Sequence, residues 1–131
     1  MIKLPSALFA RIVFVAIMIG GVVISPTVAA AQDRYGAITF SESSGAHGWS
    51  YGLPTQRSAE QQALDKCASE TDDCQAVIWF RNACGALAVG TGNAYGATWG
   101  SSPQAALDGA MSKCREQAED CKPVKWICTG R

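Results

Sequence analysis

The chain has 131 residues, with 11 basic and 11 acidic side chains and a mean hydropathy near zero, +0.06. A balanced charge of this kind offers neither the basic patch that nucleic-acid binding requires nor a lysine-rich face for anionic lipid. We therefore expect no nucleic-acid partner.

The first 31 residues have the three parts of a secretory signal peptide. Lys3 and Arg11 give a basic start, the apolar run Ile12–Ile24 follows, and Ala29–Ala31 fits the small-residue cleavage pattern. The apolar run is shorter than the roughly 17–25 residues that a membrane-spanning helix needs, which favours cleavage after residue 31 over a retained membrane anchor. Because the segment has no adjacent arginine pair and no cysteine near the cleavage site, we expect the general secretion route, to the periplasm or the medium.

Cleavage would leave residues 32–131 as a single domain. It would carry 9 basic and 11 acidic side chains, because Lys3 and Arg11 leave with the signal peptide. A net charge of −2 is too small to steer partners. We expect no stable membrane insertion after cleavage, and the sequence does not indicate an oligomeric state.

This domain contains two copies of one sequence unit, residues 35–83 and residues 84–131. Gly48–Gly52 aligns with Gly96–Gly100, and later motifs such as Asp-Cys recur at a spacing of 47 residues. A unit of about 47 residues is too small to bury an apolar face well by itself. We therefore expect the two copies to form one fold.

The first copy predicts a strand, a second strand, a helix and a third strand. The strands are expected at residues 37–41, 47–52 and 75–80, and the second of them alternates in polarity. Thr55 or Ser58 is expected to cap the helix, whose stripe of alanines would let it pack close to a sheet. The unbroken apolar run of the third strand predicts burial on both faces.

The second copy repeats this order. Ser102 is placed to cap its helix and Pro103 to occupy the first helical position. Its last strand, Pro123–Cys128, begins with proline and contains Lys125, so we expect it to lie half exposed or near an edge. The sequence thus predicts an α+β domain in which two ββαβ repeats form one mostly antiparallel sheet of about six strands, with two helices and disulfide cross-links.

All six cysteines lie after residue 31, which indicates a disulfide framework in a secreted domain. Each copy carries its own Cys-x6-Cys motif, and the two motifs are 47 residues apart. Structural zinc usually takes closer cysteine spacing and further ligands, whereas the one histidine stands alone, so we expect no metal and no cofactor. The repeat predicts the pairs Cys67–Cys74 and Cys114–Cys121, which leaves Cys84–Cys128 as a long-range cross-link.

Four segments resemble the domain-of-unknown-function (DUF) family 4189. They are Tyr35–Ile38, Gly48–Gly52, Trp79–Ala86 and Trp126–Thr129, and they span essentially the whole domain in order. The resemblance implies a small exported bacterial protein with cysteines, of a kind also found in mycobacteria. It supplies no activity and no catalytic residues.

Few residues could carry catalysis. The one histidine, His47, takes the place of Tyr95 in the other copy, so we interpret it as a packing residue of an aromatic face. Asp72-Asp73 and Glu119-Asp120 are the paired carboxylates that glycan hydrolysis would need, but they lie in polar loops and are better explained as solvated turns. Because the six cysteines are expected to be paired, no free thiol remains, and we predict no catalytic residue.

Aromatic residues are the best candidates for a binding surface, because tryptophan and tyrosine offer both apolar area and a hydrogen bond. The alternative is that these rings build the core. We expect a non-enzymatic exported binding or interaction module whose partner is a protein, an envelope polymer or a host component. A structural or stress-resistant envelope protein is the second interpretation and a secreted hydrolase the third. The residues expected to line the surface are Trp49, Tyr51, Tyr95 and Trp99.

Overall fold

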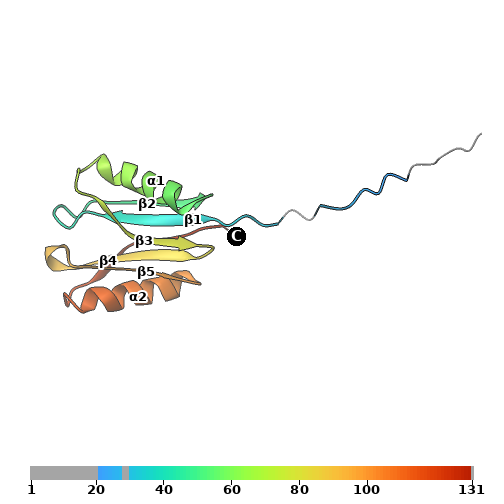
Figure 1. Ribbon diagram of the computed structural model, residues 1–131. Helices are drawn as coiled ribbons and strands as arrows, with labels where there is room; N and C mark the ends of the chain where they lie inside the picture. The colour runs from blue at the N-terminus through green and yellow to red at the C-terminus, as the bar shows by residue number, and fades with distance from the viewer. Residues whose placement is uncertain (1–20, 28–29, 131) are drawn as a thin grey trace, which may run out of the picture.

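The computed structural model describes residues 21–27 and 30–130 (Figure 1). Most of the predicted signal peptide, residues 1–20 and 28–29, lies outside the described residues. None of the helices within the described ranges combines the length and apolar character needed to span a membrane.

Residues 35–128 form two successive ββαβ halves, as the internal repeat predicts. The elements in chain order are β1 (Tyr35–Phe40), β2 (His47–Leu53), α1 (Gln56–Ala68), β3 (Gln75–Arg81), β4 (Cys84–Val89), a short 3-10 helix η1 (Thr91–Asn93), β5 (Tyr95–Gly100), α2 (Pro103–Arg115) and β6 (Lys122–Cys128).

The six strands form two antiparallel sheets of three in place of the single sheet expected. The first half gives the order β2-β1-β3 and the second half the order β5-β4-β6. The two sheets pack face to face, and α1 and α2 cover their outer faces, so the domain has four layers (Figure 1). Across the interface β3 lies over β5, and β2 lies over β6.

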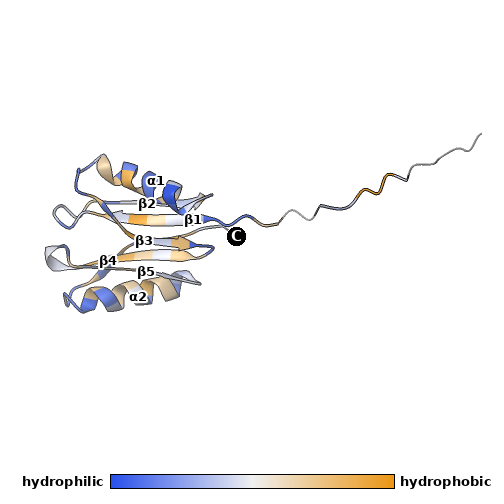
Figure 2. Ribbon diagram, in the orientation of Figure 1, coloured by the Kyte–Doolittle hydropathy of each residue, from blue (hydrophilic) through white to orange (hydrophobic). Residues whose placement is uncertain are grey.

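The central strands explain why there are two sheets. In β1, Ala37 packs against α1 while Ile38 and Phe40 pack into the layer between the sheets. In β4, Ala86 packs against α2 while Leu87 joins Ile38 in the inter-sheet layer. Both faces of each central strand are therefore buried, which one sheet with both helices on the same side would not allow. Figure 2 shows hydrophobic colour along β1 and β4, and also on β3 and on parts of both helices.

Each helix begins at the predicted cap and sits close to its sheet. Thr55 caps α1, and Ser102 caps α2 with Pro103 in the first turn. Strand hydroxyls reach the helix carbonyls: Ser50 Oγ donates to Ala59 O at 2.6 Å, and Thr98 Oγ1 donates to Ala106 O at 2.7 Å. Such close approach depends on small residues at the contact. A side chain at Gly48 or Gly96 would collide with the helix backbone, which explains the glycines there.

The edge strands confirm one sequence prediction and correct another. β6 lies at an edge of its sheet, as its proline and lysine predict. β3 is also an edge strand, and only Phe80 of its seven residues is fully buried, so the prediction that it is covered on both faces is wrong. Ile78 and Phe80 face the inter-sheet layer, whereas Trp79 lies on the α1 side at the rim with 43% of its surface exposed. Its apolar run reflects two partly apolar faces at an edge, not a central position.

The three disulfides are the two pairs predicted by the repeat and the remaining pair, and each lies within one half. Cys67–Cys74 closes a loop in the first half, and Cys114–Cys121 and Cys84–Cys128 lie in the second. The last of these joins residues directly opposite each other on β4 and β6. In the first half Tyr35 and Arg81 occupy the corresponding opposed positions.

Hydrogen bonds from backbone N–H groups, to backbone and side-chain oxygens, close both halves at the same end of the domain. Asn82 N donates to Arg34 O at 2.9 Å, and Asn82 Oδ1 accepts from Arg34 N at 2.9 Å. Thr129 N donates to Ala83 O at 2.9 Å, and Thr129 Oγ1 accepts from Ala83 N at 3.1 Å. The beginning and end of each half therefore meet at the Asn82–Ala83 junction.

Candidate ligand-binding site

The four aromatic residues predicted to form one surface do not lie together. Tyr51 and Trp99 are exposed, at 57% and 61%, but they lie on β2 and β5, at opposite edges of the sandwich. Trp49 and Tyr95 are half-buried and pack against the inter-sheet core. Of the four residues, Trp99 is exposed and also lines a pocket, so the candidate site is built around it.

The surroundings of Trp99 form a pocket at the edge where β3 lies over β5. The pocket has a volume of about 500 Å³ and is lined by Ile78, Trp79, Phe80, Arg81 and Trp99. The sequence prediction left Trp79 out of the binding set. A signal was present, because Trp79 aligns with Trp126 on a strand that was expected to be half exposed.

The hollow continues along the same edge. Two further cavities, of about 420 and 310 Å³, share Glu42, Val77 and Tyr95. The Tyr95 ring lies 5.0 Å from the Phe40 ring. Burial of the Tyr95 hydroxyl, and to a smaller extent the negative charge of Glu42, raises the pKa of Tyr95. We refer to this whole surface as the β3/β5 edge, and its residues are Glu42, Val77, Ile78, Trp79, Arg81, Tyr95 and Trp99.

At the opposite edge, where β2 lies over β6, the space between the two strands is filled, and we call it the filled edge. A cavity of about 400 Å³ lies along β6 itself, lined by Pro123, Val124, Lys125 and Trp126. Trp49 occupies the space between β2 and β6, and the Nζ atoms of Lys125 and Lys66 lie 3.7 and 4.7 Å from the centre of the Trp49 ring, within cation–π range. The repeat places Ala97 at the position of Trp49 and Ile78 at the position of Lys125. The smaller Ala97 lines one of the cavities of the β3/β5 edge. These two differences between the copies thus account for the cavities between β3 and β5 and for the filled space between β2 and β6.

The β3/β5 edge has a charge gradient along its length. Glu42 and Asp73 line the cavity near the start of β3, whereas Arg81 lines the pocket at its end. Lys113 and Glu116 both line the cavity of about 310 Å³, and their opposite charges offset each other. Arg81 pairs with Asp33 at 3.6 Å, but both side chains are at least half exposed, so this ion pair is weak. The guanidinium therefore remains accessible to a ligand.

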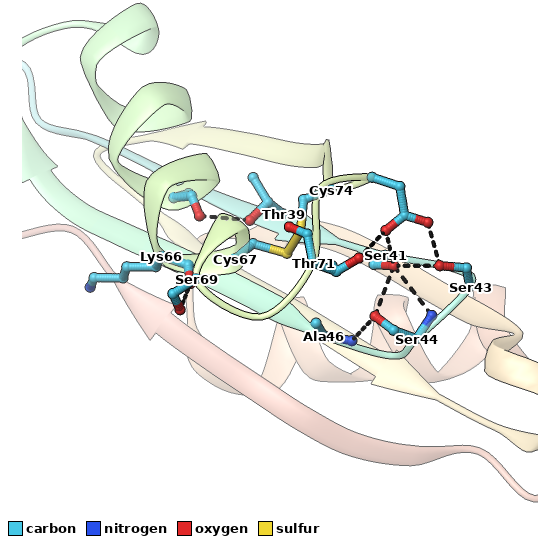
Figure 3. Close-up of a disulfide and its surroundings, with 12 residues drawn as sticks. Thr39, Ser41, Ser43, Ser44, Ala46, Lys66, Cys67, Ser69, Thr71 and Cys74 are labelled. Atoms are coloured by element: carbon cyan, nitrogen blue, oxygen red, sulfur yellow. Dashed lines mark hydrogen bonds between the residues drawn. A yellow bond between two sulfur atoms is a disulfide. The ribbon is translucent and has the colours of Figure 1, made fainter.

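The carboxylates considered for catalysis act as structural acceptors. Asp73 accepts hydrogen bonds from Ser41 at 2.6 Å, from Thr71 at 2.7 Å, and from Ser43. These bonds fasten the Cys67–Cys74 loop to the turn between β1 and β2, and Figure 3 shows the three hydroxyl groups converging beside the disulfide.

The second half repeats this arrangement with different donors. Asp120 accepts from Thr91 N at 2.9 Å and from the Thr91 hydroxyl. Hydrogen bonds from Thr91 lower the pKa of Asp120. Asp72 and Glu119 are exposed, and the His47 ring lies 6.0 Å from that of Trp49, on the filled edge. Across residues 21–27 and 30–130, no three His, Cys, Asp or Glu side chains are grouped to hold a metal ion.

Replacing Asp73 by Asn is expected to reduce stability near neutral pH and to make little difference near pH 2. Hydrogen bonds from Ser41, Ser43 and Thr71 lower the pKa of Asp73 from 3.8 to about 2. A carboxyl whose pKa is lower in the folded state stabilises the fold above its unfolded pKa, and this contribution is lost as the pH falls from 3.8 through about 2. Thermal unfolding of both proteins across this range measures the difference.

The neighbouring Asp72 supplies the control for this experiment. Both side chains are exposed, but the hydroxyl groups of Ser41, Ser43 and Thr71 donate to Asp73, so Asp72→Asn should leave the wild-type pH dependence of stability unchanged. If Asp73→Asn and Asp72→Asn showed the same pH dependence, the hydrogen bonds to Asp73 would not contribute to the acid stability of the fold.

Two comparisons with known proteins match the chain. The sequence profile of the family described as "Domain of unknown function (DUF4189)" matches residues 35–128. The NMR structure of Rv1813c from Mycobacterium tuberculosis is similar at 29% identity and a TM-score of 0.53, covering 97% of this chain and 96% of that one. A search of curated proteins gave no significant match. The matched region includes all six strands and both helices.

Proposed function

The chain belongs to the DUF4189 family, and we propose that this member is an exported, non-enzymatic binding module that recognises its ligand through the β3/β5 edge. The observation that carries the proposal is the pair of exposed tryptophans, Trp79 and Trp99, which flank one pocket at this edge. Exposed tryptophans gathered at a hollow are typical of recognition surfaces, since each ring gains much apolar contact when a ligand covers it.

Export is the second part of the proposal. Residues 1–31 have the organisation of a cleaved signal peptide, and three disulfides suit the oxidising compartments that the general secretion route reaches. The partner would then be a protein or polymer of the envelope, the medium or a host.

A non-enzymatic role is supported by what the polar residues do. The carboxylates of Asp73 and Asp120 hold loops in place, and His47 packs beside Trp49 away from the β3/β5 edge. The second candidate is a structural or stress-resistant envelope protein, which three disulfides in a domain of about 100 residues would favour. That candidate does not explain why Trp79 and Trp99, from different sheets, line the same pocket.

Trp79→Ala and Trp99→Ala are each expected to lower the affinity for the ligand by roughly tenfold or more, as truncation of a central aromatic anchor does. The measurement is capture of components from culture medium and envelope extract by the immobilised protein, followed by titration of the captured component. The variants should unfold at nearly the wild-type denaturant concentration, because both side chains lie at the surface.

The filled edge provides matched controls. Trp126 and Tyr51 occupy the equivalent positions in the other copy and are 52% and 57% exposed, so Trp126→Ala and Tyr51→Ala should leave binding unchanged. Binding that survives loss of both Trp79 and Trp99, or that falls equally in the control variants, would contradict the site. If the wild-type protein captured nothing, the result would favour the second candidate, a structural or stress-resistant envelope protein.

A further inference from the structure

The two outer strands β3 and β6 occupy equivalent places but are protected very differently. An edge strand exposes backbone N–H and C=O groups that can pair with another chain, and proteins commonly block this with lysine or proline. β6 carries three such residues, Lys122, Pro123 and Lys125. β3 has Gln75, Ala76 and Ile78 at the corresponding positions, and its only charge is Arg81 at the end. The pairing of each outer strand with its central strand also contains one register shift, so the lysines and proline are what β6 has and β3 lacks. β3 is therefore the edge strand more open to pairing.

The unpaired edge of β3 also borders the pocket and the cavities of the β3/β5 edge. The pocket of Trp79 and Trp99 adjoins the end of β3, and the cavities of Glu42 and Tyr95 adjoin its start. An open strand edge beside a row of hollows is the arrangement that recognises extended peptides, with main-chain hydrogen bonds for affinity and pockets for alternate side chains.

We propose, on the basis of the function proposed above, that the ligand is an extended polypeptide segment that adds to β3 as an antiparallel strand. Antiparallel pairing places the start of the segment beside Arg81 and its end beside Glu42 and Asp73. Charge complementarity then requires an acidic residue near the start of the segment and a basic residue near its end.

The faces of β3 determine what lies between these two charges. Ile78 faces the second sheet and Trp79 faces the α1 side, where its ring lies 6.3 Å from that of Tyr35. Successive side chains of an added strand alternate between the same two faces. Those on the Ile78 side enter the hollow next to Trp99, and those on the other side cover Trp79. Because both faces offer tryptophan rings, the ligand side chains in the middle of the segment should be apolar on both faces.

A displayed library of nine-residue peptides tests the proposal. One library fixes an acidic residue at the second position and a basic residue at the eighth, a second library exchanges the two charges, and the positions between are random. Selection on the wild-type protein should enrich apolar central residues from the first library at least tenfold over the second. N-methylation of alternate amides in an enriched peptide should weaken its binding tenfold or more, because it removes main-chain hydrogen bonds.

The protected strand supplies the matched variant. Ala76→Pro with Ile78→Lys gives β3 the proline and lysine that β6 already accommodates at the equivalent positions, so the double variant should fold and lose the enriched peptides. Ala76→Pro alone checks the strand edge without a change of charge, and urea unfolding verifies that both variants fold. A control variant, Lys125→Gln on β6, should retain peptide binding.

Three results would overturn the inference. They are enrichment that is equal in both charge libraries, peptide binding that survives in the folded double variant, or self-association of the wild-type protein that Ile78→Lys abolishes, since β3 would then pair with a second copy of the chain. These results would exclude a strand-pairing peptide ligand without excluding ligand binding at the β3/β5 edge. A captured glycan or small molecule that depends on Trp79 and Trp99 would sustain the site while excluding the strand-pairing ligand.

Discussion

Replacing Cys84 and Cys128 together by alanine is expected to lower the free energy of unfolding by about 4 kcal/mol, because this disulfide closes the longest loop. The two cysteines are 44 residues apart in sequence and directly opposite on β4 and β6. Without the cross-link the unfolded chain gains the conformational freedom of that loop. A domain of this size is typically stable by only about 5–15 kcal/mol, so the loss is a large fraction of the total. Urea unfolding of the oxidised protein and the variant measures the difference.

The local disulfide Cys67–Cys74 is the reference for that experiment. It spans only seven residues, and its removal is expected to cost about 2.5 kcal/mol in the same chain-entropy treatment. If Cys67→Ala with Cys74→Ala destabilised the protein more than the long-range pair does, loop length would not be the source of the stabilisation.

Phe80→Ala is expected to cost about 3–5 kcal/mol, the usual range for truncating a buried phenylalanine. Only 1% of the Phe80 surface is exposed, and its ring fills the layer between the two sheets. The ring packs directly on the backbone at Gly36 of its own sheet and Gly85 of the other, where an added Cβ would collide with it. Removing the ring therefore leaves a cavity between two backbones that cannot close without moving a whole sheet. Denaturant unfolding at equilibrium gives the loss.

The equivalent residue in the second copy is the control for Phe80. Ile127 packs against the same core but is only partly buried, so Ile127→Ala should cost clearly less. Phe80→Leu, which keeps an apolar side chain in the layer, should recover part of the loss. Equal costs at Phe80 and Ile127 would show that the inter-sheet layer is not centred on the phenylalanine ring.

Much of the fold was predictable because the two copies repeat their structural residues. The two local disulfides, the helix caps and the order of strands follow from local patterns that recur in both copies, and the pair Cys84–Cys128 is what remains. The division into two sheets does not follow from such patterns. The run from Gly36 to Phe40 shows which side chains are apolar, but not whether the second apolar face meets a helix or another sheet. That depends on contacts between residues of different halves.

The candidate site was predictable only in part, for a related reason. Alternation groups Tyr51 with Trp49 on β2 and Trp99 with Tyr95 on β5, and of these four residues Tyr51 and Trp99 are exposed. It could not show that β2 and β5 lie at opposite edges, nor that Trp49 is covered by Lys125 from β6. Trp79 is not among the predicted binding residues, because an apolar run in the sequence looks the same for an edge strand as for a central strand.

The closure of both halves at the Asn82–Ala83 junction makes the domain topologically permutable. Every disulfide lies within a half, so one peptide bond is the sole covalent link between two units that otherwise adhere through an apolar layer. Arg34 and Thr129 both hydrogen-bond to that junction, and the C-terminus lies beside the departing N-terminal segment (Figure 1). A gene that encoded the second half before the first, with a short linker, would specify the same strand pairs. No strand pair and no disulfide among the described residues therefore requires the first half to precede the second.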